Sequence, residues 1–559
     1  MSLHRGRRSG MAQTVCVVLS LAARQAPARD STDLLAAEQL YAEFLNSYGA
    51  RETIDSGLVN QVDGKDRDYW AGRFATQKQT LTTSLERLTS ARSSQEDAAV
   101  LASLKSGLAD FGGTTTAAPE GRCSDASRPA EPEGVLRAAL LACFREIGNH
   151  IQFAGHEMTR VAVLQLLESL EPEATRKQLF LALRPLWEAV AGDDGPTSPY
   201  RRRIAAAAAE ARTQGSPIDG AARSLGLTAP ELESALLDVL EVWRRVAVVG
   251  QVEPWDYRFR YAAASRALNP LLTRESLRPK MLRYFRDLGA DPIPMRVTYD
   301  LDPRAGKTPF AYTDLIRIGQ SIDGAWRPAA VRVSESVESA GLFTLDEMIH
   351  ETGHAVHFMA VRARPAYFEP DNFLAEAFAN VPAWSLYEPE WQRRYLGRTV
   401  CRAVGLRERY ALAMLDIAWT VFEIRMLREP NSSPNRVWTD LTSHYLGIVP
   451  HPDWAWWALR TQLVDTPGYM ANYGAGAILT AAMRERIRQS IGSFDAGNAR
   501  WYPWVSEHIL RYGSELPTEE LVARLVGGKI SAQALIADIR GVAASDPTCA
   551  AADRPRQGQ

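Results

Sequence analysis

The sequence predicts a mainly helical protein that contains one small antiparallel sheet. Apolar residues recur at helical spacing in several segments, whereas alternating and β-branched patterns are confined to one stretch of the chain. The 559 residues leave room for roughly two to four domains. Hydrophobic residues make up 46% and charged residues 23%, which is typical of globular proteins.

The helical prediction rests on five segments in which apolar residues lie three or four positions apart or alanine dominates. These segments are residues 34–45, 135–144, 161–170, 205–211 and 232–246. Residues 112–134 are rich in Gly, Thr, Ala and Pro, and they predict a loop.

The strand prediction rests on residues 295–301, 310–318 and 330–334, which alternate or are β-branched and have Gly and Pro between them. Three short strands so close in sequence predict a small antiparallel sheet.

The charge balance and the hydropathy of the chain exclude two classes of protein. Lys and Arg number 64 and Asp and Glu number 66, which gives a net charge of −2. Nucleic-acid-binding proteins usually carry a basic excess, so we expect no nucleic-acid partner. No run of eighteen apolar residues is present, so we expect no membrane span.

The first 28 residues have the three parts of a secretory signal peptide. Arg5, Arg7 and Arg8 precede a short apolar run at 15–23, and Ala26 and Ala28 form a small-x-small cleavage pattern. A cytosolic leader, or translation from an internal Met, is the alternative. The pattern predicts a secreted or periplasmic protein, and without the signal the protein is cytoplasmic.

Four cysteines would remain after cleavage at this site: Cys123, Cys143, Cys401 and Cys549. In an exported protein four cysteines allow two disulfides with three connectivities, and buried free thiols are the alternative. None of the spacings matches a cysteine zinc site.

Residues 350–354 read His-Glu-Thr-Gly-His and carry the strongest chemical signal in the chain. On a helix, His350 and His354 share one face, so two imidazoles can bind one Zn²⁺. Glu351 is then placed to act as general base toward a metal-bound water. Residues 344–347 (TLDE) form a capping-box pattern, which predicts that the helix begins there. The alternative is a surface helix with stray histidines.

Zinc in a catalytic site takes a third protein ligand, and Glu376 is the strongest candidate. It is the one carboxylate in an apolar helical run at 373–380, and burying it without a partner would be costly. Asn380, one turn later, is expected to hydrogen-bond a histidine ligand. Glu369 and Glu388 are the competitors, but they lie near prolines in segments that we expect to be exposed.

These residues resemble a known group of peptidases. Residues 350–357 (HETGHAVH) are similar to the zinc helix of the thimet oligopeptidase family, including His357, which we place behind the ligands. Residues 373–376 (FLAE) resemble its Asp-Phe-x-Glu segment, with Phe373 in place of Asp. Residues 300–307 (DLDPRAGK) resemble its D-L-Y-x-R-x-G-K stretch, with Asp302 in place of Tyr. The similarity runs from about 299 to about 487. Angiotensin-converting-enzyme-like dipeptidyl carboxypeptidases share this zinc chemistry.

The resemblance implies a gluzincin peptidase with two helical lobes, a deep central channel, one Zn²⁺ per chain and oligopeptide substrates. It also implies tyrosines over the zinc, and residues 465–473 (DTPGYMANY) resemble that segment. Tyr473, or else Tyr469, is expected to stabilise the oxyanion. Both families place a histidine just before these tyrosines, but here Val464 and Asp465 stand near that position. Arg460 is a candidate to bind a substrate carboxylate.

The sequence patterns and this resemblance together suggest a division of the chain. Residues 1–28 are the candidate signal peptide, 29–290 a helical N-terminal lobe with the loop near 112–134, 291–540 the zinc-metallopeptidase region, and 541–559 a polar tail. A monomer is expected. The sheet edge near 330–334 is expected to bind the substrate backbone.

Three functional classes follow from these observations. The first is a zinc metallopeptidase that hydrolyses oligopeptides, either as an endo-oligopeptidase or as a dipeptidyl carboxypeptidase. The second is an inactive peptide-binding protein on the same fold, and the third is a zinc enzyme acting on another small molecule. A nucleotide site is excluded because residues 306–308 (GKT) lack the first glycine of a phosphate loop, where Leu301 stands.

Overall fold

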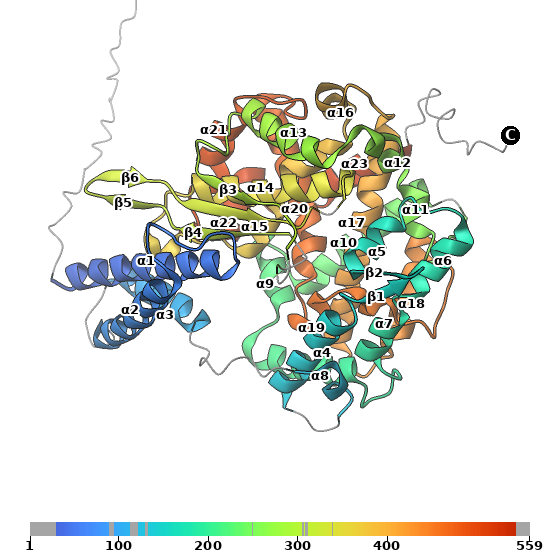
Figure 1. The fold of residues 1–559 in the computed structure, drawn as a ribbon, viewed down its shortest axis with the longest axis horizontal. Coiled ribbons are helices and arrows are strands. Elements are labelled where there is room, and N and C mark those ends of the chain that lie inside the picture. The colour runs from blue at the N-terminus through green and yellow to red at the C-terminus, as the bar shows by residue number, and fades with distance from the viewer. Residues whose placement is uncertain are drawn as a thin grey trace, which may run out of the picture.

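The computed structural model describes residues 29–88, 94–111, 121–128, 132–248, 250–304, 307, 311–337 and 339–543. The candidate signal peptide at 1–28, the end of the polar tail and Cys549 lie outside these residues. The described part consists mainly of helices, with three small sheets (Figure 1), which confirms the predicted fold class. None of its helices is both long enough and apolar enough to cross a membrane.

The first three helices pack together and against the largest sheet (Figure 1). They are α1 (Arg29–Asp55), α2 (Arg67–Leu88) and α3 (Gln95–Asp110). Phe44, Leu81 and Leu104 of these helices are fully buried in one core with Val331 and Val333 of the sheet. This core places α1 directly beside the site described below.

A second and larger core extends from Ala126 to Val542. Its central element is α17 (Arg402–Arg428), which is buried along most of its length and contacts α10, α18 and α20. The predicted boundary between the two lobes lies at position 290, and this core contains residues from both sides of it. The lobe boundaries remain a prediction. The other helices that build it are α4 (Glu133–Glu146), α5 (Arg160–Leu166), α6 (Glu173–Leu181), α7 (Arg184–Ala191), α8 (Pro199–Gln214), α9 (Pro217–Ser224), α10 (Ala229–Val246), α11 (Tyr257–Tyr261), α12 (Ala263–Leu268), α13 (Arg274–Asp287), α16 (Pro389–Leu396), α18 (Pro434–Leu446), α19 (Gln462–Asp465), α20 (Ala471–Ile491), α21 (Trp501–Val505), α22 (Thr518–Val526) and α23 (Gln533–Arg540).

Four of the five predicted helical segments lie wholly within helices α1, α4, α8 and α10. The fifth, residues 161–170, is helical only up to Leu166. The predicted loop at 112–134 contains a short helix, Cys123–Asp125, in its described part.

The largest sheet is mixed rather than antiparallel, and this corrects the prediction. Its strands are β3 (Val297–Asp300), β4 (Tyr312–Arg317) and β7 (Ala330–Ser334), in the order β3-β7-β4. β4 pairs antiparallel with β7, but β3 pairs parallel with it. The chain forms the projecting β5–β6 hairpin (Gln320–Ile322 and Ala325–Arg327; Figure 1) before β7 returns between the two earlier strands. Strand patterns define the buried face of a strand, not its neighbours.

A second hairpin was not predicted from the sequence. β1 (Ile151–Phe153) and β2 (His156–Met158) pair antiparallel across a two-residue turn. Both turn residues, Ala154 and Gly155, have positive φ angles of 50° and 80°. Such turns usually contain Asn-Gly or Asp-Gly, so an Ala-Gly pair gave no sequence signal.

One disulfide joins Cys123 to Cys143 and so ties the short helix at 123–125 to α4. This bond is one of the pairings that the four cysteines allow. Cys401 is also disulfide-bonded.

Candidate active site

The His-Glu-Thr-Gly-His segment lies on α14 (Leu342–Ala360), a largely buried helix. The helix begins at Leu342, two residues before the predicted capping box, which was therefore wrong. Its first N–H group is bound by a distant side chain, since Leu342 N donates to Asn269 Oδ1 at 2.8 Å. Thr344 instead donates to the carbonyl of Ser339 at 3.2 Å. A cap supplied by tertiary contact leaves no local sequence pattern.

His350 and His354 lie on one face of α14, with 3.1 Å between their Nε2 atoms. Glu376 reaches the same point from α15 (Asn372–Ala383). Its Oε2 atom is 3.5 Å from Nε2 of His350 and 4.0 Å from Nε2 of His354. The Glu376 side chain is only 14% exposed, so it does not lie on a solvated helix face.

Gly353 allows the two helices to approach this closely. A Cβ atom at position 353 would lie 3.0 Å from the Cα and 3.1 Å from the carbonyl oxygen of Ala379 on α15. Real Cβ atoms rarely have neighbours so near, so a larger residue would push α15 away from α14. The glycine inside the motif therefore controls the distance from Glu376 to the histidines.

These three side chains fit a zinc ion. Zn–N and Zn–O bonds of about 2.0–2.1 Å in a tetrahedral site put neighbouring ligand atoms roughly 3.3 Å apart. The observed ligand-to-ligand distances of 3.1, 3.5 and 4.0 Å surround that value. Two imidazoles and one carboxylate are also the donor types found in catalytic zinc sites. His350, Glu351 and His354 alone already form a cluster that could hold a metal ion.

Electrostatics favour positive charge at this point. Burial lowers the pKa of His350, but bonding to Glu376 outweighs burial and raises that pKa to about 9. Burial likewise works against ionisation of Glu376, yet His350 and His354 bring its pKa down to about 2. The pKa of His354 is lowered by burial and by the charge of His350. The carboxylate therefore stays ionised and attracts a cation.

Glu351 is 92% buried and is held by a residue that sequence reasoning missed. The Thr313 hydroxyl on β4 lies 2.7 Å from Glu351 Oε2 and 2.8 Å from the Glu351 carbonyl oxygen. Its single proton is shared between these two acceptors. Thr313 lay inside a predicted strand, but no motif marked its role, because the contact joins positions 38 residues apart.

The structure brings both predicted tyrosines to the site. The Tyr469 hydroxyl donates to Glu376 Oε1 at 3.3 Å and accepts from the Asn372 side chain at 2.8 Å. The Tyr473 hydroxyl accepts a 3.4 Å hydrogen bond from the Gln462 amide, and its ring centre is 5.8 Å from that of Tyr469. Tyr469 therefore contacts Glu376, the predicted third ligand, whereas the hydroxyl proton of Tyr473 is available for another acceptor.

Asn380 and His357 lie beside the site on α15 and α14. The Asn380 amide donates to the Glu376 carbonyl at 3.1 Å and accepts from Arg409 at 3.1 Å, rather than bonding a histidine. His357 is buried and packs against Phe378, with ring centres 5.4 Å apart. Neither of its ring nitrogens has a hydrogen-bond partner among the described residues. The ring of His357 therefore contributes to the packing between α14 and α15.

The two competing carboxylates, Glu369 and Glu388, form no hydrogen bond or ion pair with His350 or His354. Glu388 is buried, contrary to expectation, and forms two hydrogen bonds of 2.7 and 2.9 Å with Arg402. Glu369 lines the cavity described next.

The site opens into a cavity of about 1380 Å³. Its walls come from elements as far apart in sequence as α1 and α20. Its lining includes Tyr48, Arg160, Arg258, Thr313, His350, Glu351, His354, Glu376, Arg460, Tyr469 and Tyr473.

Arg460 lines this cavity but already has an acidic partner. Its guanidinium forms an ion pair with Asp416 and lies 4.7 Å from the ring centre of Trp419 and 5.8 Å from that of Tyr473. Burial lowers the pKa of Arg460 to about 10. The position beside Tyr473 fits a substrate-binding role, although the charge is largely neutralised by Asp416.

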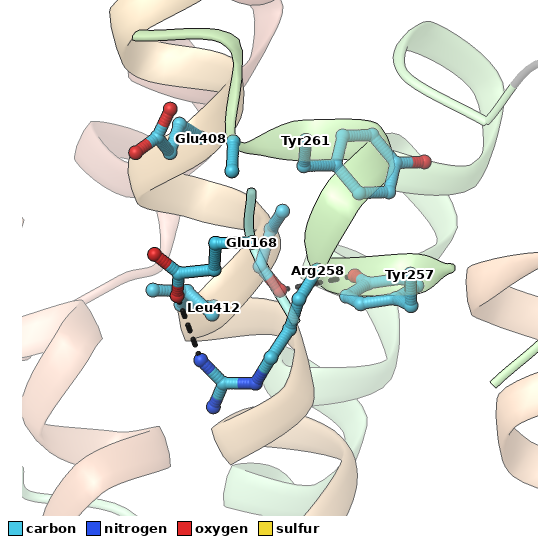
Figure 2. Close-up of a pocket in the computed structure, with 8 residues that line it drawn as sticks. Glu168, Tyr257, Arg258, Tyr261, Glu408 and Leu412 are labelled. Carbon is cyan, nitrogen blue, oxygen red and sulfur yellow. Dashed lines mark hydrogen bonds and ion pairs between the residues drawn. The ribbon is translucent and has the colours of Figure 1, made fainter. Parts of the chain in front are cut away.

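Two further arginines that sequence reasoning missed lie in the same region. Arg258 pairs with Glu168 at 3.0 Å, and Figure 2 shows its guanidinium turned toward that carboxylate. Arg160 donates to the Leu459 carbonyl at 2.7 Å but forms no ion pair with any described residue. Burial and the repulsion of Arg258 lower the pKa of Arg160 to about 10. A partly buried cation without an acidic partner attracts an anionic ligand.

Comparison with known proteins identifies the class to which this fold belongs. No family model and no curated protein sequence matches the chain. Solved structures do match, and two of them are described as carboxypeptidases.

The M32 carboxypeptidase from Deinococcus radiodurans R1 is 16% identical, with a TM-score of 0.52 over 92% of this chain and 98% of that one. The carboxypeptidase of Pyrococcus furiosus is 13% identical, with a TM-score of 0.51 over 92% and 99%. The protein thus has the fold of these carboxypeptidases over nearly its whole described length.

Proposed function

We propose that this protein is a zinc-dependent peptidase that shortens oligopeptides inside its central cavity. One observation carries the proposal: His350, His354 and Glu376 converge at zinc-ligand distances beside the buried Glu351, within a cavity large enough for a peptide. The fold shared with known carboxypeptidases supports it.

Zinc, when bound, lowers the pKa of a coordinated water and polarises the substrate carbonyl. Glu351 accepts the proton of the attacking water and later delivers a proton to the leaving amine. Thr313 holds the Glu351 carboxylate in one orientation throughout. Tyr473 donates its hydroxyl proton toward the developing oxyanion, and Tyr469 keeps Glu376 oriented.

The substrate backbone pairs with β4 rather than with the segment near 330–334. β7 has neighbours on both sides and therefore offers no free edge, which corrects the expectation. β4 is an edge strand, and residues 311–315, which lead into it and form its first part, line the cavity. α1 covers its other end, where Asn46 Oδ1 accepts from Ile318 N at 2.9 Å. An extended peptide can add to the open part of β4 by main-chain hydrogen bonds.

The arginine cluster favours cleavage near a free C-terminus. Burial and the charges of neighbouring arginines lower the pKa of Arg160 and of Arg460, and among the three arginines Arg258 and Arg460 have acidic partners. The uncompensated charge of Arg160 fits one carboxylate, which a peptide C-terminus supplies. Arg460 then contributes to substrate binding through its position beside Tyr473.

Metal analysis together with peptide turnover tests the proposal. Wild-type protein is expected to bind about one zinc and to cleave short peptides, whereas Glu351→Gln retains zinc and is nearly inactive. A wild type that holds no metal and cleaves nothing would favour the peptide-binding protein. A zinc-loaded wild type that acts only on non-peptide amides would favour the third functional class.

Peptides with an amidated C-terminus separate the two modes of cleavage. A carboxypeptidase loses nearly all activity on amidated peptides, and Arg160→Gln should abolish its preference for the free acid. Equal turnover of both substrates supports endo-oligopeptidase action, which the cavity volume of about 1380 Å³ also accommodates.

We further propose that the protein works in an oxidising compartment. The Cys123–Cys143 disulfide supports export, because such bonds persist mainly outside the cytosol. Sequencing of the mature N-terminus from the native host tests this: cleavage near Ala28 is expected, and an intact Met1 with reduced thiols would contradict it.

A further inference from the structure

The turn that carries Tyr469 is held from behind by α17. Residues 466–470 lead into α20, and Gly468 adopts a positive φ of 96° there. Tyr469 points from this turn to Glu376, so the orientation of the third ligand depends on where the turn lies.

Glu423 of α17 holds both sides of Tyr469. One of its carboxylate oxygens accepts from Gly468 N at 2.8 Å, and the other accepts from Met470 N at 2.9 Å. One turn earlier on the same helix, the Thr420 hydroxyl donates to the Met470 carbonyl at 2.6 Å. Three hydrogen bonds therefore fix the residues that flank Tyr469.

Glu423 is fully buried, and the described residues place no Lys or Arg in hydrogen-bond or ion-pair contact with it. Burying a carboxyl group without a cation is costly. Glutamine would be cheaper to bury, but it has only one acceptor oxygen and would turn an N–H₂ group toward one of the two donors. The site therefore needs two acceptors in one plane, which a carboxylate supplies.

We infer that Glu423 is a positioning residue for the zinc site: it fixes the 466–470 turn so that Tyr469 can hold Glu376 in its ligand orientation. The inference rests on the proposed function, because it requires Glu376 to bind zinc. Groups behind metal ligands typically change metal affinity by about 10–100-fold when removed. Glu423 acts one step further back than Tyr469, so its effect should be transmitted entirely through that residue.

The test is a double-mutant cycle read by zinc affinity in competition with a chromogenic chelator. Glu423→Gln and Tyr469→Phe should each weaken zinc binding by about 10-fold or more. The double variant should bind zinc no more weakly than Tyr469→Phe alone. Once the Tyr469 hydroxyl is removed, the turn no longer orients Glu376, so loss of Glu423 has no further effect on zinc.

Glu408→Gln is the matched control. Glu408 is also buried on α17 and accepts two hydrogen bonds from Ser265 N, at 3.0 and 3.2 Å, but it does not contact the 466–470 turn. Its zinc affinity should equal that of the wild type. If Glu423→Gln fails to fold, Thr420→Val replaces it in the cycle, because that change removes the third bond to the same turn.

The outcomes separate the inference from the proposed function. If the wild type binds zinc and cleaves peptides but Glu423→Gln matches Glu408→Gln, the inference fails and the peptidase stands. If the effects of Glu423→Gln and Tyr469→Phe add, Glu423 acts through general stability, and the inference is again overturned. A wild type that binds no zinc refutes both.

Discussion

Replacing Thr313 by valine isolates the orientation of the general base. The change keeps the β-branched shape on β4 and removes only the hydroxyl that lies 2.7 Å from Glu351 Oε2. A hydrogen bond to a charged group contributes about 1.5–3 kcal/mol. At about 1.4 kcal/mol per decade, losing it from the transition state lowers kcat/KM by about 10–100-fold.

The assay measures kcat, KM and zinc content with one short peptide. Most of the loss should appear in kcat, because Thr313 contacts Glu351 and touches neither the metal ligands nor the arginine cluster. Zinc content should stay at the wild-type level. Thr298→Val is the control, since Thr298 is exposed on β3 of the same sheet and should leave both constants unchanged.

Wild-type kcat in Thr313→Val would refute the reasoning, because it would mean that Glu351 is oriented without this hydrogen bond. A loss confined to zinc content would also refute it, since the hydroxyl would then act on the metal ligands.

Three further predictions concern packing, pH and the disulfide. Gly353→Val should push α15 away from α14 and lower zinc affinity by at least about 10-fold. The helix content measured by circular dichroism should stay at the wild-type level. An unchanged zinc affinity would contradict the argument that Gly353 sets the distance between these helices. Burial raises the pKa of Glu408 to about 8, above its unfolded value of about 4.5, so the stability from its neutral form is complete below pH 4.5 and is lost as pH rises toward 8. The free energy of unfolding, measured by thermal melts from pH 5 to 8, should therefore fall by up to about 1.4 kcal/mol per pH unit in the wild type and less steeply in Glu408→Gln. The same pH dependence in both proteins would rule this out. Replacing Cys123 and Cys143 by serine should lower the unfolding free energy by about 2–4 kcal/mol, measured by urea titration, and an unchanged midpoint would show that the bond does not stabilise the fold.

The sequence was most informative where the geometry is local. His350 and His354 lie one helical turn apart, and the apolar run around Glu376 already implied burial with a compensating partner. The start of α14, by contrast, depends on Asn269, which is 73 positions away. The positions of Thr313 and Arg160 in the site likewise result from contacts between elements far apart in the chain. No residue spacing in the sequence predicts such contacts.

The strand order shows the same limit. The three segments at 295–301, 310–318 and 330–334 do contain strands, but their pairing depends on β7 entering between the earlier two. The alternation of apolar and polar residues shows which face of a strand is buried, but it is the same beside a parallel or an antiparallel neighbour. It therefore could not distinguish a mixed sheet from an antiparallel one.

The distribution of the site along the chain has a consequence for how the protein loses activity. His350 and Glu376 are 26 positions apart on two helices in direct contact, so under the proposed function the zinc ligands belong to one local unit. Thr313 and Arg160 come from other segments, and separate segments of a protein can open independently. Mild denaturant should therefore produce a species that still carries its metal yet turns over no peptide. For this protein, metal content reports an intact helix pair, and only turnover reports the whole assembly.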